Sequence, residues 1–83
     1  EHIELIDRAD IPRFAALGVT ASVQPTHAPG VMDFPAAAMA AVYPPARWRD
    51  AHLARTLADH GAHLAFASDW PVTDVSVMRG LHG

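Results

Sequence analysis

Two helix-to-strand units, one after the other, are the feature that most restricts how this chain can fold. In the first unit, Asp10–Leu17 has an acidic residue as a candidate cap and Pro12 in its first turn, and Gly18 follows as a stop, which predicts a short helix. The β-branched and small residues Val19–Val23 then predict a buried strand that ends at Gln24.

The second unit repeats this order. Residues Ala46–His60 predict one helix that ends at Gly61, with its apolar side chains gathered broadly on one face: Trp48, Ala51, Leu53, Leu57 and Ala58. His63–Ala67 predicts a second buried strand. Helices that alternate with strands through short connections are typical of a parallel sheet, so we predict an α/β fold.

The segment between the two units predicts a loop and a further helix. The loop runs from Thr26 through Asp33, and an alanine-rich helix lies between Pro35 and Tyr43 before two prolines end it. We find no internal repeat and no low-complexity linker.

Charge and composition exclude several classes of function. Six basic residues against nine acidic ones give a net charge of −3, and the basic residues are scattered, which indicates neither a nucleic-acid face nor a membrane patch. The chain has no cysteine, so any metal must be bound by His, Asp or Glu. No apolar run is long enough to span a membrane and the first residues do not resemble a secretory signal, so we expect a cytoplasmic protein.

Polar side chains follow both predicted strands. Gln24, Thr26 and His27 follow the first strand, and Ser68, Asp69 and Trp70 follow the second. Functional groups gather beyond the carboxyl ends of parallel strands, so both sets are candidates for one site. Asp69 fits two roles: a cap for the loop backbone, or a general base in a loop that Trp70 and Pro71 stiffen and partly shield from water.

Histidines supply further candidates. His2 lies in "EHIELI", which is compatible with the tail of another strand, and by itself it fits either a structural residue or a metal ligand. His60 and His63 are three residues apart but straddle Gly61, so we do not expect them to share a helical face. We interpret His60 as a residue suited to a helix C-terminus and His63 as a surface residue at the start of a strand.

The sequence closely resembles the late part of the metal-dependent amidohydrolase superfamily, in the branch called amidohydrolase family 3. The resemblance covers "EHIELIDRADIPRFAALGVTASVQPTHAPG" and, after a helix, "LADHGAHLAFASDWPV". Its most specific parts are Glu1-His2, Ser22–Pro25 and Ser68–Val72. It implies that residues 1–83 form one partial domain of a (β/α)8 barrel, from the end of strand 6 through strand 8 and the following loop.

The resemblance also implies roles for individual residues. His2 would end the sixth barrel strand and bind a divalent metal, usually zinc. Asp69 would end the eighth strand, contact the metal centre, take a proton from the attacking water and deliver one to the leaving amine. Gln24, His27 and Trp70 are expected at the rim of the crevice as substrate-binding residues, from their positions alone. Ala67 departs from the family, which commonly has glycine there.

Length sets the expectation for the isolated chain. A barrel of this kind needs roughly 250 residues, and one histidine with one aspartate is too small a ligand set for zinc. We therefore expect a piece of a hydrolase acting on C–N bonds of amides or cyclic amides, inactive without the remaining barrel strands. The alternative is a small non-catalytic α/β module that self-associates or complements another chain, because parallel strands need their edges covered.

Overall fold

The computed structural model describes residues 1–31 and 36–82. In these residues two strands are present, β1 (Ala21–Val23) and β2 (Leu64–Phe66). The α-helices of the same part are α1 (Ile11–Leu17), α2 (Ala36–Val42), α3 (Ala54–Asp59) and α4 (Val77–His82). Short 3-10 helices are η1 (Arg8–Asp10), η2 (Pro25–His27) and η3 (Pro45–Asp50).

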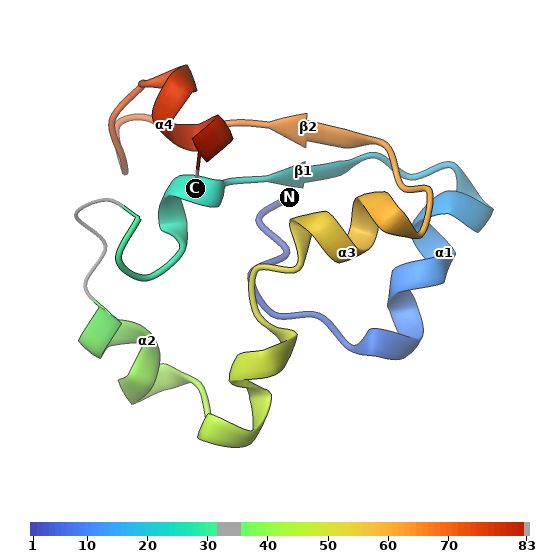
Figure 1. The fold of residues 1–83 in the computed structure, drawn as a ribbon, viewed down its shortest axis with the longest axis horizontal. Coiled ribbons are helices and arrows are strands. Elements are labelled where there is room, and N and C mark those ends of the chain that lie inside the picture. Colours follow the sequence, from blue (N-terminus) through green and yellow to red (C-terminus); the bar gives the residue numbers. More distant parts are fainter. Residues whose placement is uncertain (32–35, 83) are drawn as a thin grey trace.

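The two strands are parallel, as the alternation of elements predicted. Ala21 pairs with Leu64 and Val23 with Phe66. Val23 also forms a parallel bridge with His2, so β1 lies between the N-terminal segment and β2 (Figure 1). This order is compatible with part of an amidohydrolase barrel, in which three consecutive strands lie side by side.

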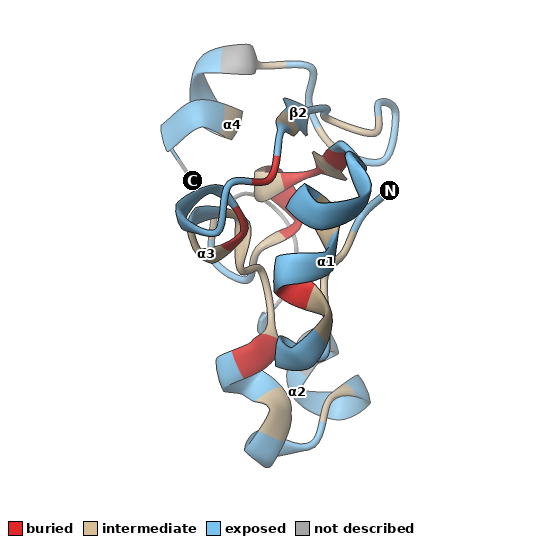
Figure 2. Ribbon diagram, turned by 90° about the vertical axis from the view of Figure 1, so that its right-hand side faces the viewer, coloured by how far each residue is buried: buried red, intermediate tan, exposed pale blue. Residues whose placement is uncertain are grey.

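The core lies between β1 and the helices α1 and α3, while α2 projects away from it and is largely exposed (Figures 1 and 2). Its buried apolar residues are Ile6, Ile11, Ala21, Val23, Leu57 and Ala62. Leu57 is fully buried, which contributes about 1.5–3 kcal/mol relative to an exposed side chain. Gly18 ends α1 with a φ of 66°, and Gly61 follows α3 with a φ of 82°, so both predicted glycine stops are confirmed.

The prediction of one continuous helix over Ala46–His60 is wrong. The chain leaves η3 at Ala51 and begins α3 only at Ala54. Between them His52 has a φ of 52° and its backbone N–H donates to the Glu4 carbonyl at 2.9 Å, while Ala51 forms an antiparallel bridge with Leu5. Pairing with the N-terminal segment has replaced helical hydrogen bonds, and Trp48 consequently lies half exposed, away from the core.

Two smaller predictions are also wrong. β2 is not buried: Phe66 is 51% exposed, because β2 is the outer strand of the two. Asp10 occupies the N-cap position of α1, but its carboxylate makes no capping hydrogen bond and instead accepts one from Arg13 Nη1 at 2.7 Å.

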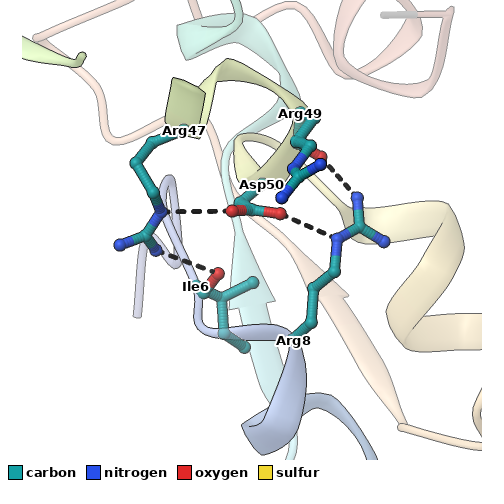
Figure 3. A network of polar contacts seen from close by, with 5 residues as sticks. All are labelled: Ile6, Arg8, Arg47, Arg49 and Asp50. Atoms are coloured by element: carbon teal, nitrogen blue, oxygen red, sulfur yellow. Dashed lines mark hydrogen bonds and ion pairs between the residues drawn. The ribbon is translucent and has the colours of Figure 1, made fainter. Parts of the chain in front are cut away.

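Asp50 joins the N-terminal segment to η3 (Figure 3). Its carboxylate accepts hydrogen bonds from Arg8 Nε at 2.7 Å and Arg47 Nε at 3.1 Å, while Arg8 Nη2 donates to the Arg49 carbonyl and Arg47 Nη2 to the Ile6 carbonyl. The hydrogen bond from Arg8 lowers the pKa of Asp50, although partial burial of the carboxyl works in the opposite direction. This Asp50 clamp holds the segment that follows Glu4, at Ile6 and Arg8, against η3.

The remaining predictions concern the middle of the chain. α2 confirms a helix over Ala36–Val42, whereas its predicted start at Pro35 and the end of the preceding loop at Asp33 lie outside the described residues.

Within the described ranges, no helix combines the length and apolar character needed to cross a membrane.

Candidate functional site

Three of the predicted site residues come together at the carboxyl ends of the strands. His2 is bridged to Val23, the last residue of β1, and His27 ends η2 shortly after it. The imidazole rings of His2 and His27 are stacked, with centroids 5.8 Å apart and planes 18° from parallel. Asp69 follows β2, and its Oδ2 lies 3.9 Å from His27 Nε2. His27 therefore contacts both of the other residues.

Glu4 is a member of this site that the sequence analysis missed. Its Oε1 lies 2.8 Å from His27 Nδ1, and its Oε2 accepts a hydrogen bond from the Tyr43 hydroxyl at 3.4 Å. Burial, followed by the negative charge of Glu4, raises the pKa of Tyr43. No local pattern indicated Glu4, because the segment from His2 to Glu4 is not an extended strand: His2 and Ile3 have left-handed φ values, and Glu4 joins the site through His27.

His52 also lies near this group. Burial lowers its pKa, the charge of Glu4 works against that change, and the charge of His27 adds to it. The other histidines lie apart, as predicted: His60 Nδ1 is 2.8 Å from the Thr56 carbonyl at the end of α3, and His63 is exposed.

Gln24 is buried rather than placed at a rim. It is 2% exposed, and among the described residues neither its carboxamide nitrogen nor its oxygen has a hydrogen-bond partner. Gln24 lines a pocket of about 460 Å³ together with His2 and His52. His27, 3% exposed, is likewise buried, so the predicted rim position is wrong for both residues.

Asp69 lines a second pocket, of about 370 Å³, which lies between β2 and α4. The loop around it is held by other groups: Ser68 Oγ accepts from the Trp70 backbone N–H, and the Thr73 hydroxyl donates to the Ser68 carbonyl. The Asp69 side chain, 35% exposed, is thus left facing His27 and the pocket. Trp70 is 69% exposed and does not line either pocket.

Backbone strain concentrates at the same place. The non-glycine residues with left-handed φ are His2 (68°), Ile3 (54°), His52 (52°) and Asp69 (58°). A positive φ is costly for a β-branched residue such as Ile3, and conformations of this kind cost on the order of 1–3 kcal/mol each. Such strain persists where the surrounding contacts enforce it, and here all four residues belong to the site or adjoin it.

The cluster also contains ligands suitable for a metal. His2, Glu4 and His27 each offer one ligand atom, and these atoms lie within 4.8 Å of one another. Zinc is commonly bound by imidazole nitrogen and carboxylate oxygen atoms. The residues present therefore fit a divalent transition metal.

Comparison with known proteins gives one result. A model of a protein family described as "Amidohydrolase family" matches residues 1–83, the whole length of the chain. Neither the curated proteins nor the solved structures contain a significant match.

Proposed function

Because this chain belongs to the amidohydrolase family, we propose that it forms part of a metal-dependent hydrolase that cleaves the C–N bond of an amide or cyclic amide. The observation that carries the proposal is the convergence of His2, His27 and Asp69 beyond the carboxyl ends of neighbouring parallel strands. In barrels built from βα units, catalytic groups come from the ends of several strands at this face.

The proposed cofactor is a divalent metal, with zinc as the first candidate. His2 and Asp69 are the ligands proposed from the resemblance, and the nearby carboxylate and imidazole of Glu4 and His27 support a site of this chemistry. When bound, such a metal lowers the pKa of a water molecule and polarises a carbonyl oxygen.

Asp69 is the proposed general base. It takes a proton from the attacking water as the new C–O bond forms, and it returns a proton to the leaving nitrogen as the C–N bond breaks, which yields a carboxylic acid and an amine. Two observations support this role: Asp69 lines the pocket of about 370 Å³, and its Oδ2 lies 3.9 Å from His27 Nε2.

Gln24, His27 and Trp70 are the proposed substrate-binding residues. The buried carboxamide of Gln24 offers a donor and an acceptor side by side, which complements the C=O and N–H of an amide. Trp70 is proposed as an apolar wall, a role for which its exposed ring is available.

The chain is proposed to act with additional barrel strands and to be inactive alone, in a cytoplasmic setting. A complete barrel needs roughly 250 residues, so the three neighbouring strand segments seen here account for only part of one. The missing strands would supply further ligands and most of the substrate-binding loops.

A non-catalytic module that self-associates or complements another chain is the second candidate. It is favoured by the outer position of β2 and by exposed apolar side chains at this end of the molecule: Phe66, Val75, Met78 and Leu81. Sedimentation of the purified chain tests it, because a discrete oligomer is expected for a self-associating module and a monomer would contradict it.

The test of the catalytic proposal is Asp69→Asn in an intact enzyme that contains these residues. We expect most of the metal to be retained through the other ligands, and turnover to fall about 10²–10⁴-fold, because the proton acceptor is lost. Asp74→Asn is the matched control, since Asp74 is an exposed aspartate of the same loop. Normal turnover in the Asp69 variant would refute the assignment of the base.

A further inference from the structure

An apolar pocket adjoins the candidate site. It has a volume of about 660 Å³ and lies between the turn after η2, the helix α2 and the segment that leaves η3. Its lining residues include Ala28, Ala36, Ala37, Ala40, Trp48 and His52. Pockets that bind small molecules are mostly apolar and have volumes of about 300–1,000 Å³. This pocket is therefore large enough to hold part of a substrate.

Small side chains create this space. Ala36 and Ala40 are four residues apart in α2 and therefore share a helical face, and Ala37 is three residues from Ala40 on the same side. All three are exposed. Trp48 adds an aromatic surface that is 50% exposed, and its indole N–H already donates to the Tyr43 carbonyl at 2.9 Å. The part of the Trp48 ring that a ligand can contact is therefore apolar.

Two residues belong both to this pocket and to a pocket of the candidate site. Ala28 and His52 line the 660 Å³ space and also the 460 Å³ space that contains His2 and Gln24. A ligand that contacts Gln24 can therefore place a substituent in the apolar pocket. Burial lowers the pKa of His52, so its ring is neutral at neutral pH and adds no charge where the two spaces meet.

We propose that the 660 Å³ pocket binds an apolar substituent, an aryl ring or a branched alkyl group, of an amide whose polar end lies beside Gln24. The inference rests on the proposed function for the amide and deepens it by naming the class of substrate. The buried carboxamide of Gln24 complements the C=O and N–H of the amide, while the alanines and Trp48 complement hydrocarbon.

The same lining disfavours a charged substituent. None of the described residues that line the 660 Å³ pocket carries a fixed charge. A carboxylate or an ammonium group placed there would lose water without gaining a partner of opposite charge, which is costly. We therefore expect discrimination against substrates whose substituent is charged, in addition to a preference for large apolar groups.

The experiment is a calorimetric titration of an intact enzyme that contains these residues, with phenylmethanesulfonamide and with methanesulfonamide. The two probes share S=O and N–H groups, resist hydrolysis and differ by one phenyl ring. We expect the phenyl compound to bind at least about tenfold more tightly, because even one methylene in an apolar pocket changes binding by that factor.

Leucine at position 40 should fill the pocket. In Ala40→Leu we expect the preference for the phenyl compound to be lost and the affinity for methanesulfonamide to stay unchanged. Ala38→Leu is the matched control, because Ala38 is an exposed alanine of the same helix that does not line the pocket. Leucine is nearly as good a helix former as alanine. Ala37→Leu provides a second test from the pocket side of α2, and circular dichroism checks the fold of each variant.

Equal affinities of the two sulfonamides in the wild type would overturn the proposal, since they would mean that another part of the enzyme covers the pocket. An unchanged preference in both Ala40→Leu and Ala37→Leu would overturn it as well. Hydrolysis of phenylacetamide is measured separately. A preference that depends on Ala40 without hydrolysis of amides would refute the proposed function and leave the pocket standing, whereas hydrolysis with equal affinities would refute the pocket alone.

Discussion

The Asp50 clamp and the cluster of His2, Glu4 and His27 have similar geometry and different chemistry. In each region a carboxylate oxygen lies close to a ring or guanidinium nitrogen, 2.7 Å for Asp50 with Arg8 and 2.8 Å for Glu4 with His27. Each joins segments that are distant in sequence. Distance and burial alone therefore do not distinguish a structural carboxylate from a functional one.

The difference lies in the nitrogen partners. Arginine keeps its proton at any ordinary pH and has no lone pair for a metal, so the Asp50 clamp can only hold the fold together. Histidine can give up a proton and offer a nitrogen as a ligand. Backbone strain follows the same division: His2, Ile3 and Asp69 have left-handed φ values, whereas the residues of the clamp do not.

The sharpest way to test this contrast is the effect of zinc on thermal stability. A cation at a hundredfold excess over its Kd adds about 2.7 kcal/mol of stability, or roughly 10–20 °C in Tm for a chain of this size. We expect that shift in the wild type and in Asp50→Asn, and its loss in Glu4→Gln. Differential scanning calorimetry with zinc and with a chelator measures it, and a full shift in Glu4→Gln would remove the distinction between the two regions.

A second and smaller effect belongs to the Asp50 clamp. Because the pKa of Asp50 is lowered in the folded state, its contribution to stability is present above the unfolded value of 3.8 and is lost as the pH falls through the folded value. Asp50→Asn should therefore lower the urea midpoint at pH 7, and the gap to the wild type should narrow as the pH falls below 3.8. A gap that is constant with pH would mean that the charge of Asp50 contributes nothing.

The smallest effect is expected at His52. Burial lowers its pKa in the folded state, so the unfolded chain binds more protons below the ordinary value of 6.5, and stability falls as the pH drops through that range. His52→Asn removes the titrating group while tolerating the left-handed backbone. Between pH 7.5 and 5.5, the urea midpoint of His52→Asn should fall less than that of the wild type. An equal fall in the two proteins would show that His52 does not cause this pH dependence.

Local signals in the sequence were sufficient for the elements that end at glycine. α1 with Gly18, the segment before Gly61 and the parallel pairing of β1 with β2 all followed from short-range patterns. The break between η3 and α3 did not, because it depends on backbone bonds from residues 51 and 52 to the N-terminal segment. Helical periodicity carries no information about such a distant partner.

The candidate site likewise contains some residues that the sequence predicted and others that it did not. His27 and Asp69 were found because they follow strand-like segments, and parallel strands bring such positions together. His2 became a candidate ligand only through the family resemblance. Glu4 was missed because it becomes a site residue only through contact with His27, 23 positions away. The burial of Gln24 was missed for a related reason, since a residue just after a strand is as easily imagined at a rim as in a core.

The buried carboxamide of Gln24 has a consequence for how this sequence can change. Among the residues that the structure describes, this carboxamide has no hydrogen-bond partner, and a buried polar group left so costs about 1–3 kcal/mol, a large share of the stability of a small domain. An apolar side chain of similar size would remove that cost, so selection for stability alone would favour replacing Gln24. Its presence indicates a trade-off, in which the fold tolerates a less stable core and keeps a polar group available beside His2.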